Sequence, residues 1–303
     1  MKKIFLVPYG GLGNQLFQIA AAMSLSEGGS VVVLSEWGFG RLNQKNEIEI
    51  QSLLWPSRIC FDNSSNIAKI SKRFLNLLLR LGSEDRFKIT LKIMEKIATG
   101  YFAFTLRARI QTRINRGLGI SVLGIKNQTL LIGYFQGISL PNAVKRDLLK
   151  LKISSFSNYG MELINKVKQK KIVIVHVRRG DYVNEAFGLL ENNYYKRALS
   201  LLSDVKFEEI WVFSDDVESA KEIEVFNTYK RTIFVDDKGL ESAEILEIMR
   251  YGVGYIIANS SFSWWAAYLR HQDSAPVVYP EPWFKFQKSP KHIAESGWIQ
   301  VDW

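Results

Sequence analysis

Two arginines and an aspartate stand together in residues 176–181, which read His-Val-Arg-Arg-Gly-Asp. The preceding residues 172–175 are apolar at every position, which predicts a strand buried on both faces. Parallel α/β sheets bind ligands at the carboxyl ends of such strands. There, Arg178 and Arg179 could bind a phosphate through paired N–H groups, provided that the backbone turns at Gly180. A surface ion pair at the strand end is the alternative.

A second cluster, Ala-Asn-Ser-Ser-Phe-Ser-Trp-Trp, occupies residues 258–265 between a predicted strand and a predicted helix. We expect Ser260 or Ser261 near the helix N-cap, where a serine hydroxyl binds an N–H of the first turn. The two hydroxyls, the free N–H groups and the helix dipole could equally bind a phosphate. At least one of Trp264 and Trp265 should belong to the core.

Gly11 and Gly13 follow the first predicted strand, 3–9, and begin an apolar helix. Leu16 replaces the third glycine of the dinucleotide-binding fingerprint, so the sequence does not predict a Rossmann cofactor site. Backbone without side chains can still approach an anion at a helix N-terminus, where Asn14 adds an amide. A tight strand–helix turn is the alternative.

Acidic residues end two other predicted strands. Asp215 and Glu218 have capping-box spacing, so we expect Asp215 to cap the next helix, although it also lies at the rim of the predicted site. The chain has no Asp-x-Asp motif, and its three histidines lack the spacing of metal ligands. No metal site is predicted.

Strands and helices alternate from residue 170 onward, which predicts a parallel α/β sheet covered by helices. The predicted strands are 171–177, 209–213, 231–235 and 253–258, and the predicted helices are 192–203, 216–225, 241–251 and 262–271. With earlier strands at 3–9, 31–34 and 129–134 and a helix at 142–150, we expect two α/β domains facing across a cleft. Their expected bounds are 1–160 and 161–303, although the last residues could pack back on the first domain.

The composition is that of a globular protein, with 303 residues, 47% of them hydrophobic and 23% charged. The single cysteine, Cys60, excludes an internal disulfide and fits a reducing compartment. The apolar run after Lys2-Lys3 stops at Pro8, too early for a signal peptide, and no stretch reaches the length of a transmembrane helix. A soluble, cytoplasmic protein is expected.

Most of the net charge of +10 lies in residues 58–117, which hold 13 Lys or Arg and 4 Asp or Glu. Apolar residues recur there at helical spacing, which predicts amphipathic helices with basic outer faces. Such a face could simply be solvated, or it could contact an anionic partner. We favour a membrane surface or a lipid-linked phosphate over nucleic acid, because no nucleic-acid-binding motif is present.

Four blocks, 10–18, 176–182, 213–216 and 257–267, together resemble the bacterial α-1,2-fucosyltransferases of glycosyltransferase family 11. The resemblance extends from residue 4 to about 283. It implies a B-type glycosyltransferase fold, with an acceptor domain followed by a GDP-fucose domain. It also implies metal-independent, inverting transfer of fucose to O2 of a β-linked galactose in a surface glycan such as an O-antigen, with no cofactor.

The resemblance also assigns roles to individual residues. Arg178 would hold the β-phosphate of GDP, Arg179 would shape the donor site, and His176 would lie against the nucleoside. The remaining donor-site and cross-domain residues would be Gly11, Gly13, Asn14, Asp215, Asn259, Ser260, Ser261, Phe262 and Ser263.

Three assignments stay open. Asp181, or alternatively Glu185, is our candidate base for the acceptor hydroxyl, while a salt bridge orienting Arg179 is an equal alternative for Asp181. The aspartate expected in the helix before the serine block is replaced by Ile245, so Glu244 is the candidate for guanine selection. A non-catalytic nucleotide-sugar-binding protein and a protein O-fucosyltransferase are the competing functional classes.

Overall fold

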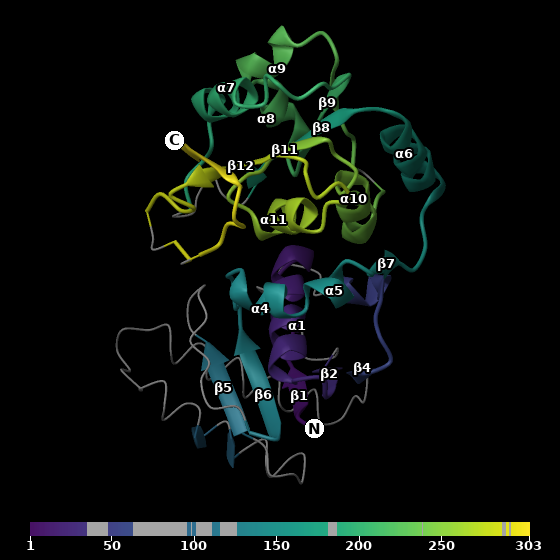
Figure 1. Cartoon of the computed structure of the whole chain (residues 1–303), viewed down its shortest axis with the longest axis vertical. Coiled ribbons are helices and arrows are strands. Elements are labelled where there is room, and N and C mark those ends of the chain that lie inside the picture. Colours follow the sequence, from purple (N-terminus) through teal and green to yellow (C-terminus); the bar gives the residue numbers. More distant parts are fainter. Residues whose placement is uncertain are drawn as a thin grey trace. The chain divides into compact units, whose positions relative to one another are not determined.

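The computed structural model describes residues 1–34, 48–62, 96–97, 99–100, 111–115, 126–180, 187–237, 239–286, 289–290 and 292–303. The chain forms two compact units, Met1–Leu151 and Lys152–Trp303 (Figure 1). The boundary expected between residues 160 and 161 lies inside helix α6 (Asn158–Gln169), which belongs entirely to the second unit.

The first unit is built on a parallel sheet with strand order β4-β2-β1-β6-β5. Its strands are β1 (Lys3–Leu6), β2 (Ser30–Leu34), β4 (Ile59–Asp62), β5 (Gln111–Asn115) and β6 (Gln128–Gly133). The apolar strand β1 lies at the centre and leads into helix α1 (Leu12–Leu25), which buries most of its residues. The three strands predicted in this unit are therefore confirmed.

One prediction for the first unit needs correction, and another lies mostly outside the described residues. Strands β4 and β5 form the two edges of the sheet and stand near the two ends of the basic segment 58–117. The amphipathic helices predicted between them, from Phe74 to Ile97, lie almost entirely outside the described residues. The helix predicted at 142–150 is instead two short helices, because the backbone leaves helical geometry at Val144. The shorter elements are η2 (Glu49–Ser52), β3 (Leu53–Leu54), α4 (Ser139–Ala143) and α5 (Lys145–Leu148).

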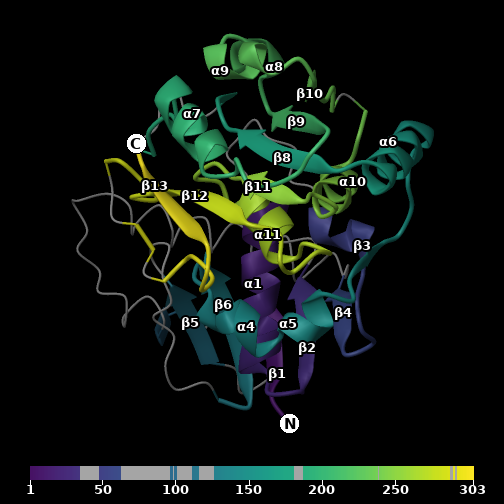
Figure 2. The ribbon, with the colours of Figure 1, turned by 45° about the horizontal axis from the view of Figure 1, so that its top comes forward.

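The second unit contains a parallel sheet with order β10-β9-β8-β11-β12-β13 (Figure 2). Its strands are β8 (Ile172–Val177), β9 (Glu209–Ser214), β10 (Thr232–Phe234), β11 (Gly254–Ile256), β12 (Val277–Glu281) and β13 (Ile299–Asp302). The chain builds outward from β8 in one direction and then returns to its other side with β11. The gap between β8 and β11 is thus the switch point at which open α/β sheets bind ligands.

Helices connect these strands in the alternation that the sequence predicts. They are α7 (Asn192–Ser200), α8 (Val217–Lys221), α9 (Glu224–Thr228), α10 (Ser242–Met249) and α11 (Ser261–Tyr268), while β7 (Lys152–Ile153) precedes α6. The helix predicted at 216–225 is two helices, α8 and α9. At the end of the chain, β13 pairs with β12 and extends the second sheet.

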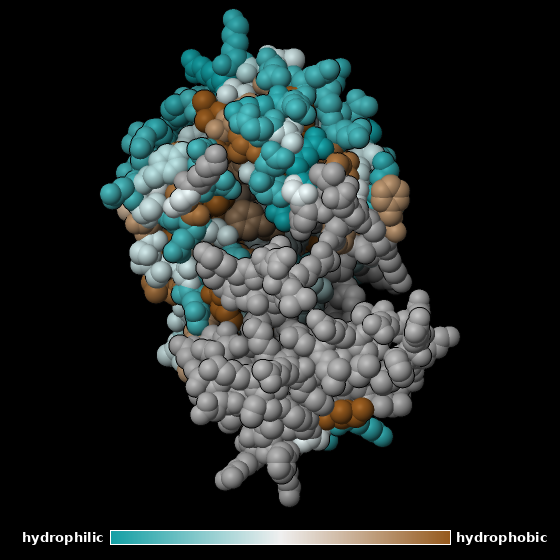
Figure 3. All heavy atoms as spheres, turned by 180° about the vertical axis from the view of Figure 1, so that it is seen from behind, coloured by the Kyte–Doolittle hydropathy of each residue, from teal (hydrophilic) through white to brown (hydrophobic). Residues whose placement is uncertain are grey.

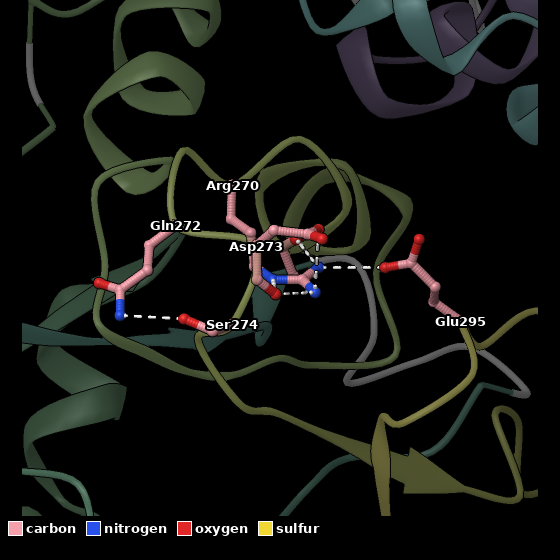
Figure 4. A network of polar contacts seen from close by, with 6 residues as sticks. Arg270, Gln272, Asp273, Ser274 and Glu295 are labelled. Carbon is pink, nitrogen blue, oxygen red and sulfur yellow. Dashed lines mark hydrogen bonds and ion pairs between the residues drawn. The ribbon is translucent and has the colours of Figure 1, made fainter.

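Helix α11 is fixed at both ends. Both of its tryptophans, Trp264 and Trp265, are fully buried, which confirms their core position. Beyond its C-terminus, the Arg270 guanidinium donates hydrogen bonds to Ala267 O, Asp273 O and Glu295 Oε2 (Figure 4). This network holds the helix in place and so fixes its N-terminus at the carboxyl edge of the sheet.

A buried carboxylate joins helices α6 and α10. Glu244 is 2% exposed and accepts hydrogen bonds from the N–H and hydroxyl of Ser157, at 2.6 and 2.8 Å. Its other oxygen accepts from Glu241 N at 2.9 Å and completes a capping box. Gly160 must lack a side chain because an added Cβ would overlap Glu244 Oε1.

Two features of the described residues bear on whether the chain can cross or contact a membrane. Among the described residues, none of the helices has the length and apolar character needed to cross a bilayer. Apolar residues on the described surface visible in Figure 3 are scattered among hydrophilic ones.

Replacement of Glu244 tests its structural role. We expect Glu244→Ala to lower the free energy of unfolding by about 2–3 kcal/mol, because two backbone N–H groups and the Ser157 hydroxyl lose their buried acceptor. Urea unfolding followed by tryptophan fluorescence measures the change. Glu162→Ala is the matched control, since Glu162 forms an exposed pair with Lys166 on α6 and should unfold close to wild type. A Glu244→Ala midpoint equal to that of the control would contradict the role.

Candidate functional site

One carboxylate from β9 organises the two arginines that follow β8. Asp215 Oδ1 accepts a hydrogen bond from the backbone N–H of Arg179 at 2.9 Å. Its Oδ2 lies 3.2 Å from Arg178 Nη1, and the Arg178 side chain remains 30% exposed. The contact is possible because β8 and β9 are adjacent, with Val177 in register with Ser214. This contact orients the Arg178 guanidinium at the strand end, where its N–H groups suit the oxygen atoms of an anion.

The predicted cap at Asp215 was wrong, and the next residue explains why. Asp216 caps α8, because its carboxylate accepts from the N–H and hydroxyl of Ser219 at 3.1 and 2.7 Å. These hydrogen bonds lower the pKa of Asp216. Asp215 is therefore left to contact the arginines, and a Cβ added at Gly180 would lie 2.4 Å from its Oδ2, so that this carboxylate would have to shift.

The serine block begins helix α11 on the other side of β8. Ser260 is the N-cap, as expected, and its Oγ accepts from Phe262 N at 3.3 Å. Ser261 and Phe262 are half-buried at the first turn. Ser263 is fully buried, and its hydroxyl lies within hydrogen-bond distance of Ala258 O and Ser260 O. Ser261 is thus better placed than Ser263 to meet a ligand.

Asn259 connects the serine block to residues 187–188, which follow the arginines in sequence. Its side chain is 1% exposed and donates to the carbonyls of Phe187 and Gly188 at 3.2 and 3.1 Å. Gly188 has φ +83° and packs against Trp303 and Lys285 without room for a Cβ. The structure therefore gives Asn259 a part in holding residues 187–188 beside the strand ends.

His176, the second-last residue of β8, is buried at the same edge. Its ring centroid lies 6.0 Å from that of Phe262, and its carbonyl accepts from the Tyr195 hydroxyl at 3.3 Å. Burial, with a smaller contribution from the Arg178 cation, lowers the pKa of His176 to about 3. The imidazole is therefore neutral near pH 7. Its Nδ1 has no hydrogen-bond partner among the described residues.

Two predicted site residues, Asp181 and Glu185, lie outside the described residues. Glu244 has both oxygens engaged by helix-capping groups, as described above. In the described part of the chain, no group of three or more His, Cys, Asp or Glu side chains is arranged to hold a metal ion.

In the first unit, the glycine motif forms the start of α1. Gly11 is the N-cap and Gly13 lies buried in the first turn. Two glutamines of the same motif hold the loop before the helix, since Gln15 donates to Gly10 O and Gln18 bonds both backbone groups of Tyr9.

Asn14 has a partner that the sequence analysis missed. Its Oδ1 accepts a hydrogen bond from Gln136 Nε2 at 2.9 Å, across 122 residues of chain. Gln136 lies just after β6, and no local pattern marks it as a site residue. Only the position of a polar residue after a buried strand could have drawn attention to it.

The described residues thus form a cationic edge in the second unit. Arg178, Arg179, Ser261 and the N-terminus of α11 all lie at the carboxyl ends of the adjacent strands β8 and β11, next to Asp215 at the end of β9. These groups suit an anionic ligand with several oxygens, such as a diphosphate.

The neutral state of His176 is directly measurable. The pKa of His176 falls from 6.5 to about 3 on folding, so the unfolded chain takes up this proton first as the pH is lowered. The effect of His176 on the free energy of unfolding is therefore most favourable above pH 6.5, and the folded state loses stability as the pH falls from 6.5 toward 3. Imidazole ¹⁵N chemical shifts of the folded protein should therefore show a neutral ring from about pH 8 down to about pH 5. A protonation midpoint between about pH 6 and 7 would contradict the burial argument.

The chain matches a known family and known proteins over nearly its whole length. The model of glycosyl transferase family 11 matches residues 9–302. The chain is 28% identical over 312 residues to the O-antigen biosynthesis glycosyltransferase WbnK of Escherichia coli, covering 96% of this chain and 98% of that protein. It is 27% identical over 310 residues to an α-1,2-colitosyltransferase of Escherichia coli, with 97% of each chain covered.

A solved structure of POFUT1 in complex with GDP-fucose resembles the fold, with a TM-score of 0.50 at 13% sequence identity. The match covers 92% of this chain and 98% of that one. It supports the expected B-type glycosyltransferase fold with its two α/β domains. The family match over nearly the whole chain settles its membership: the chain belongs to glycosyltransferase family 11.

Proposed function

We propose that the protein transfers L-fucose from GDP-β-L-fucose to O2 of a terminal β-galactose, with inversion and without a metal ion. The observation that carries the proposal is the arginine pair held by Asp215 beside the N-terminus of α11. The family match supports glycosyl transfer, and the name of one relative supports an α-1,2 linkage. A fold like that of POFUT1, whose structure contains GDP-fucose, supports the donor.

Charge development on the leaving group explains why cations are needed there. Fucosyl transfer passes through an oxocarbenium-like state while negative charge grows on the departing GDP. Arg178 and Arg179 would oppose that charge more strongly in the transition state than in the ground state. The N–H groups of α11 and the hydroxyl of Ser261 would bind the remaining phosphate oxygens. In this proposal the guanidinium groups take the place of a divalent ion.

A second donor has a specific observation in its favour. One relative, 27% identical over nearly the whole chain, is an α-1,2-colitosyltransferase. The same cationic edge would serve a nucleotide-linked colitose, since the phosphates rather than the sugar contact the arginines. Transfer of colitose but not of fucose would therefore favour this alternative.

One displacement with inversion requires a base near the acceptor hydroxyl. We propose Asp181 for this role, with Glu185 as the second candidate, because both follow the arginine pair closely in sequence. If Asp181→Asn weakened donor binding but left the rate with bound donor intact, Asp181 would be excluded as the base.

The acceptor is proposed to be an oligosaccharide, which could be lipid-linked at the inner face of the membrane. The O-antigen relative and the basic balance of residues 58–117 support this, with peripheral membrane contact through that segment. Failure of anionic liposomes to retain the protein at low salt would exclude the membrane contact.

A transfer assay tests the function. We expect the protein to add fucose from GDP-fucose to oligosaccharides ending in β-galactose, with an α-1,2 linkage in the product. EDTA in the assay should leave the rate unchanged. Linkage analysis by NMR identifies the product. Absence of transfer to every galactoside would refute the acceptor assignment, and loss of activity in EDTA would refute metal independence.

Substitution of Arg178 tests the leaving-group role. We expect Arg178→Ala to lower kcat by about 10²–10³, as for loss of one group that stabilises developing negative charge. Arg178→Lys should recover little, because lysine lacks the planar fork of donors. Arg231→Ala is the control, since Arg231 is exposed and precedes β10 at the opposite end of the strands. A kcat for Arg178→Ala close to that of the control would refute the assignment.

A further inference from the structure

A buried acceptor atom without a donor lies in the first unit. The side chain of Gln136 is 6% exposed, and its Nε2 donates to Asn14 Oδ1 at 2.9 Å. Its Oε1 is buried and has no hydrogen-bond partner among the described residues. Buried polar atoms are nearly always paired, because an unpaired one gives up its bond to water without a replacement. This atom therefore calls for a functional explanation.

Its place in the sheet is one at which ligands bind. Strands β1 and β6 are neighbours, with Lys3 in register with Gln128. The chain extends from β1 through β2 to β4 on one side and returns with β5 and β6 on the other, so β1 and β6 flank the switch point. Asn14 follows β1 and Gln136 follows β6. Their hydrogen bond thus joins the two sides of the switch point at its carboxyl end.

The backbone around Gln136 has positive φ angles, one of them at a residue other than glycine. Gly133, Phe135 and Gly137 have φ values of +155°, +55° and +153°. Phe135 is fully buried and is not a glycine, so its left-handed conformation costs stability. Backbone of this kind concentrates at binding sites, which agrees with the unpaired oxygen beside it.

The chemistry of the pair indicates what it binds. Both side chains are neutral amides, and the unpaired atom is a carbonyl oxygen, which repels phosphate oxygens and accepts from hydroxyl groups. We propose that Gln136 Oε1, with Asn14, binds a hydroxyl group of the neutral sugar acceptor. The soft terminal torsion of Gln136 would turn Oε1 toward the incoming hydroxyl. This inference rests on the proposed glycosyl transfer and assigns Gln136 to its acceptor side.

Acceptor and donor affinities are measured separately to test the assignment. Gln136→Met keeps the length of the side chain and removes both amide groups. We expect the KM for the acceptor to rise about tenfold, while the affinity for GDP measured by calorimetry stays at the wild-type value. Equal loss of both affinities, or an acceptor KM within about twofold of wild type, would overturn the proposal.

Acceptors that each lack one hydroxyl group show which hydroxyl Gln136 binds. The first of these measurements uses the wild-type protein alone. Wild type should discriminate against one monodeoxy galactoside by about tenfold, and Gln136→Met should abolish that difference because the contact is already lost. Gln128→Met is the matched control: Gln128 begins β6 at the end of the strand away from Gln136, so this variant should keep the wild-type discrimination. If wild type treated all monodeoxy acceptors alike, the proposal would fail even if Gln136→Met did not fold.

Binding measurements separate this inference from the proposed function. If no galactoside accepts fucose, the proposed reaction fails. Saturation-transfer NMR with GDP and a panel of neutral oligosaccharides then measures acceptor binding and so tests the inference independently of the reaction. Binding by wild type that is lost in Gln136→Met would support the amide site, and absence of binding by wild type would overturn it.

Discussion

The carboxylate of Asp215 is the contact on which the candidate site depends. It reaches from the end of β9 to the neighbouring strand end and accepts from the Arg179 backbone and the Arg178 guanidinium. The ion pair with this carboxylate fixes the direction of the Arg178 guanidinium, and the hydrogen bond from Arg179 N fixes the backbone at the strand end. Gly180 leaves the room that this carboxylate needs, and Asp216 frees it by capping α8.

Each of the two units has a switch point in its sheet, but the side chains at the two switch points differ in charge. Each has a parallel sheet whose switch point carries polar side chains at the carboxyl ends of adjacent strands. In the second unit these side chains include two guanidiniums next to a helix N-terminus. In the first they are the neutral amides of Asn14 and Gln136. In the proposed reaction, this difference would match an anionic donor and a neutral acceptor.

Local patterns in the sequence predicted those features that local physics determines. The apolar run before Arg178 is the buried central strand β8, and the alternation after residue 170 is the second sheet. Ser260 caps α11 because N-capping depends on its immediate neighbours. The N-cap of α8 could not be predicted from its neighbours, because both Asp215 and Asp216 stand at a spacing that fits the N-cap position before this helix. The arginines of a different strand attract Asp215, and only the folded sheet brings them together.

Other parts of the site had no local signal. Gln136 meets Asn14 across 122 residues, and nothing near it in sequence marks the contact. Ser263 belongs to a serine-rich block that suggested phosphate binding, yet helical periodicity places its hydroxyl against backbone carbonyls in the interior. Asp181 and Glu185 lie outside the described residues, so their proposed role still rests on sequence.

A crystal structure of the protein with GDP bound would test the central claim most directly. The account predicts that the diphosphate contacts the Arg178 guanidinium and the first turn of α11, with Asp215 still bound to the Arg179 backbone. A diphosphate bound elsewhere, with Arg178 directed into solvent, would contradict it.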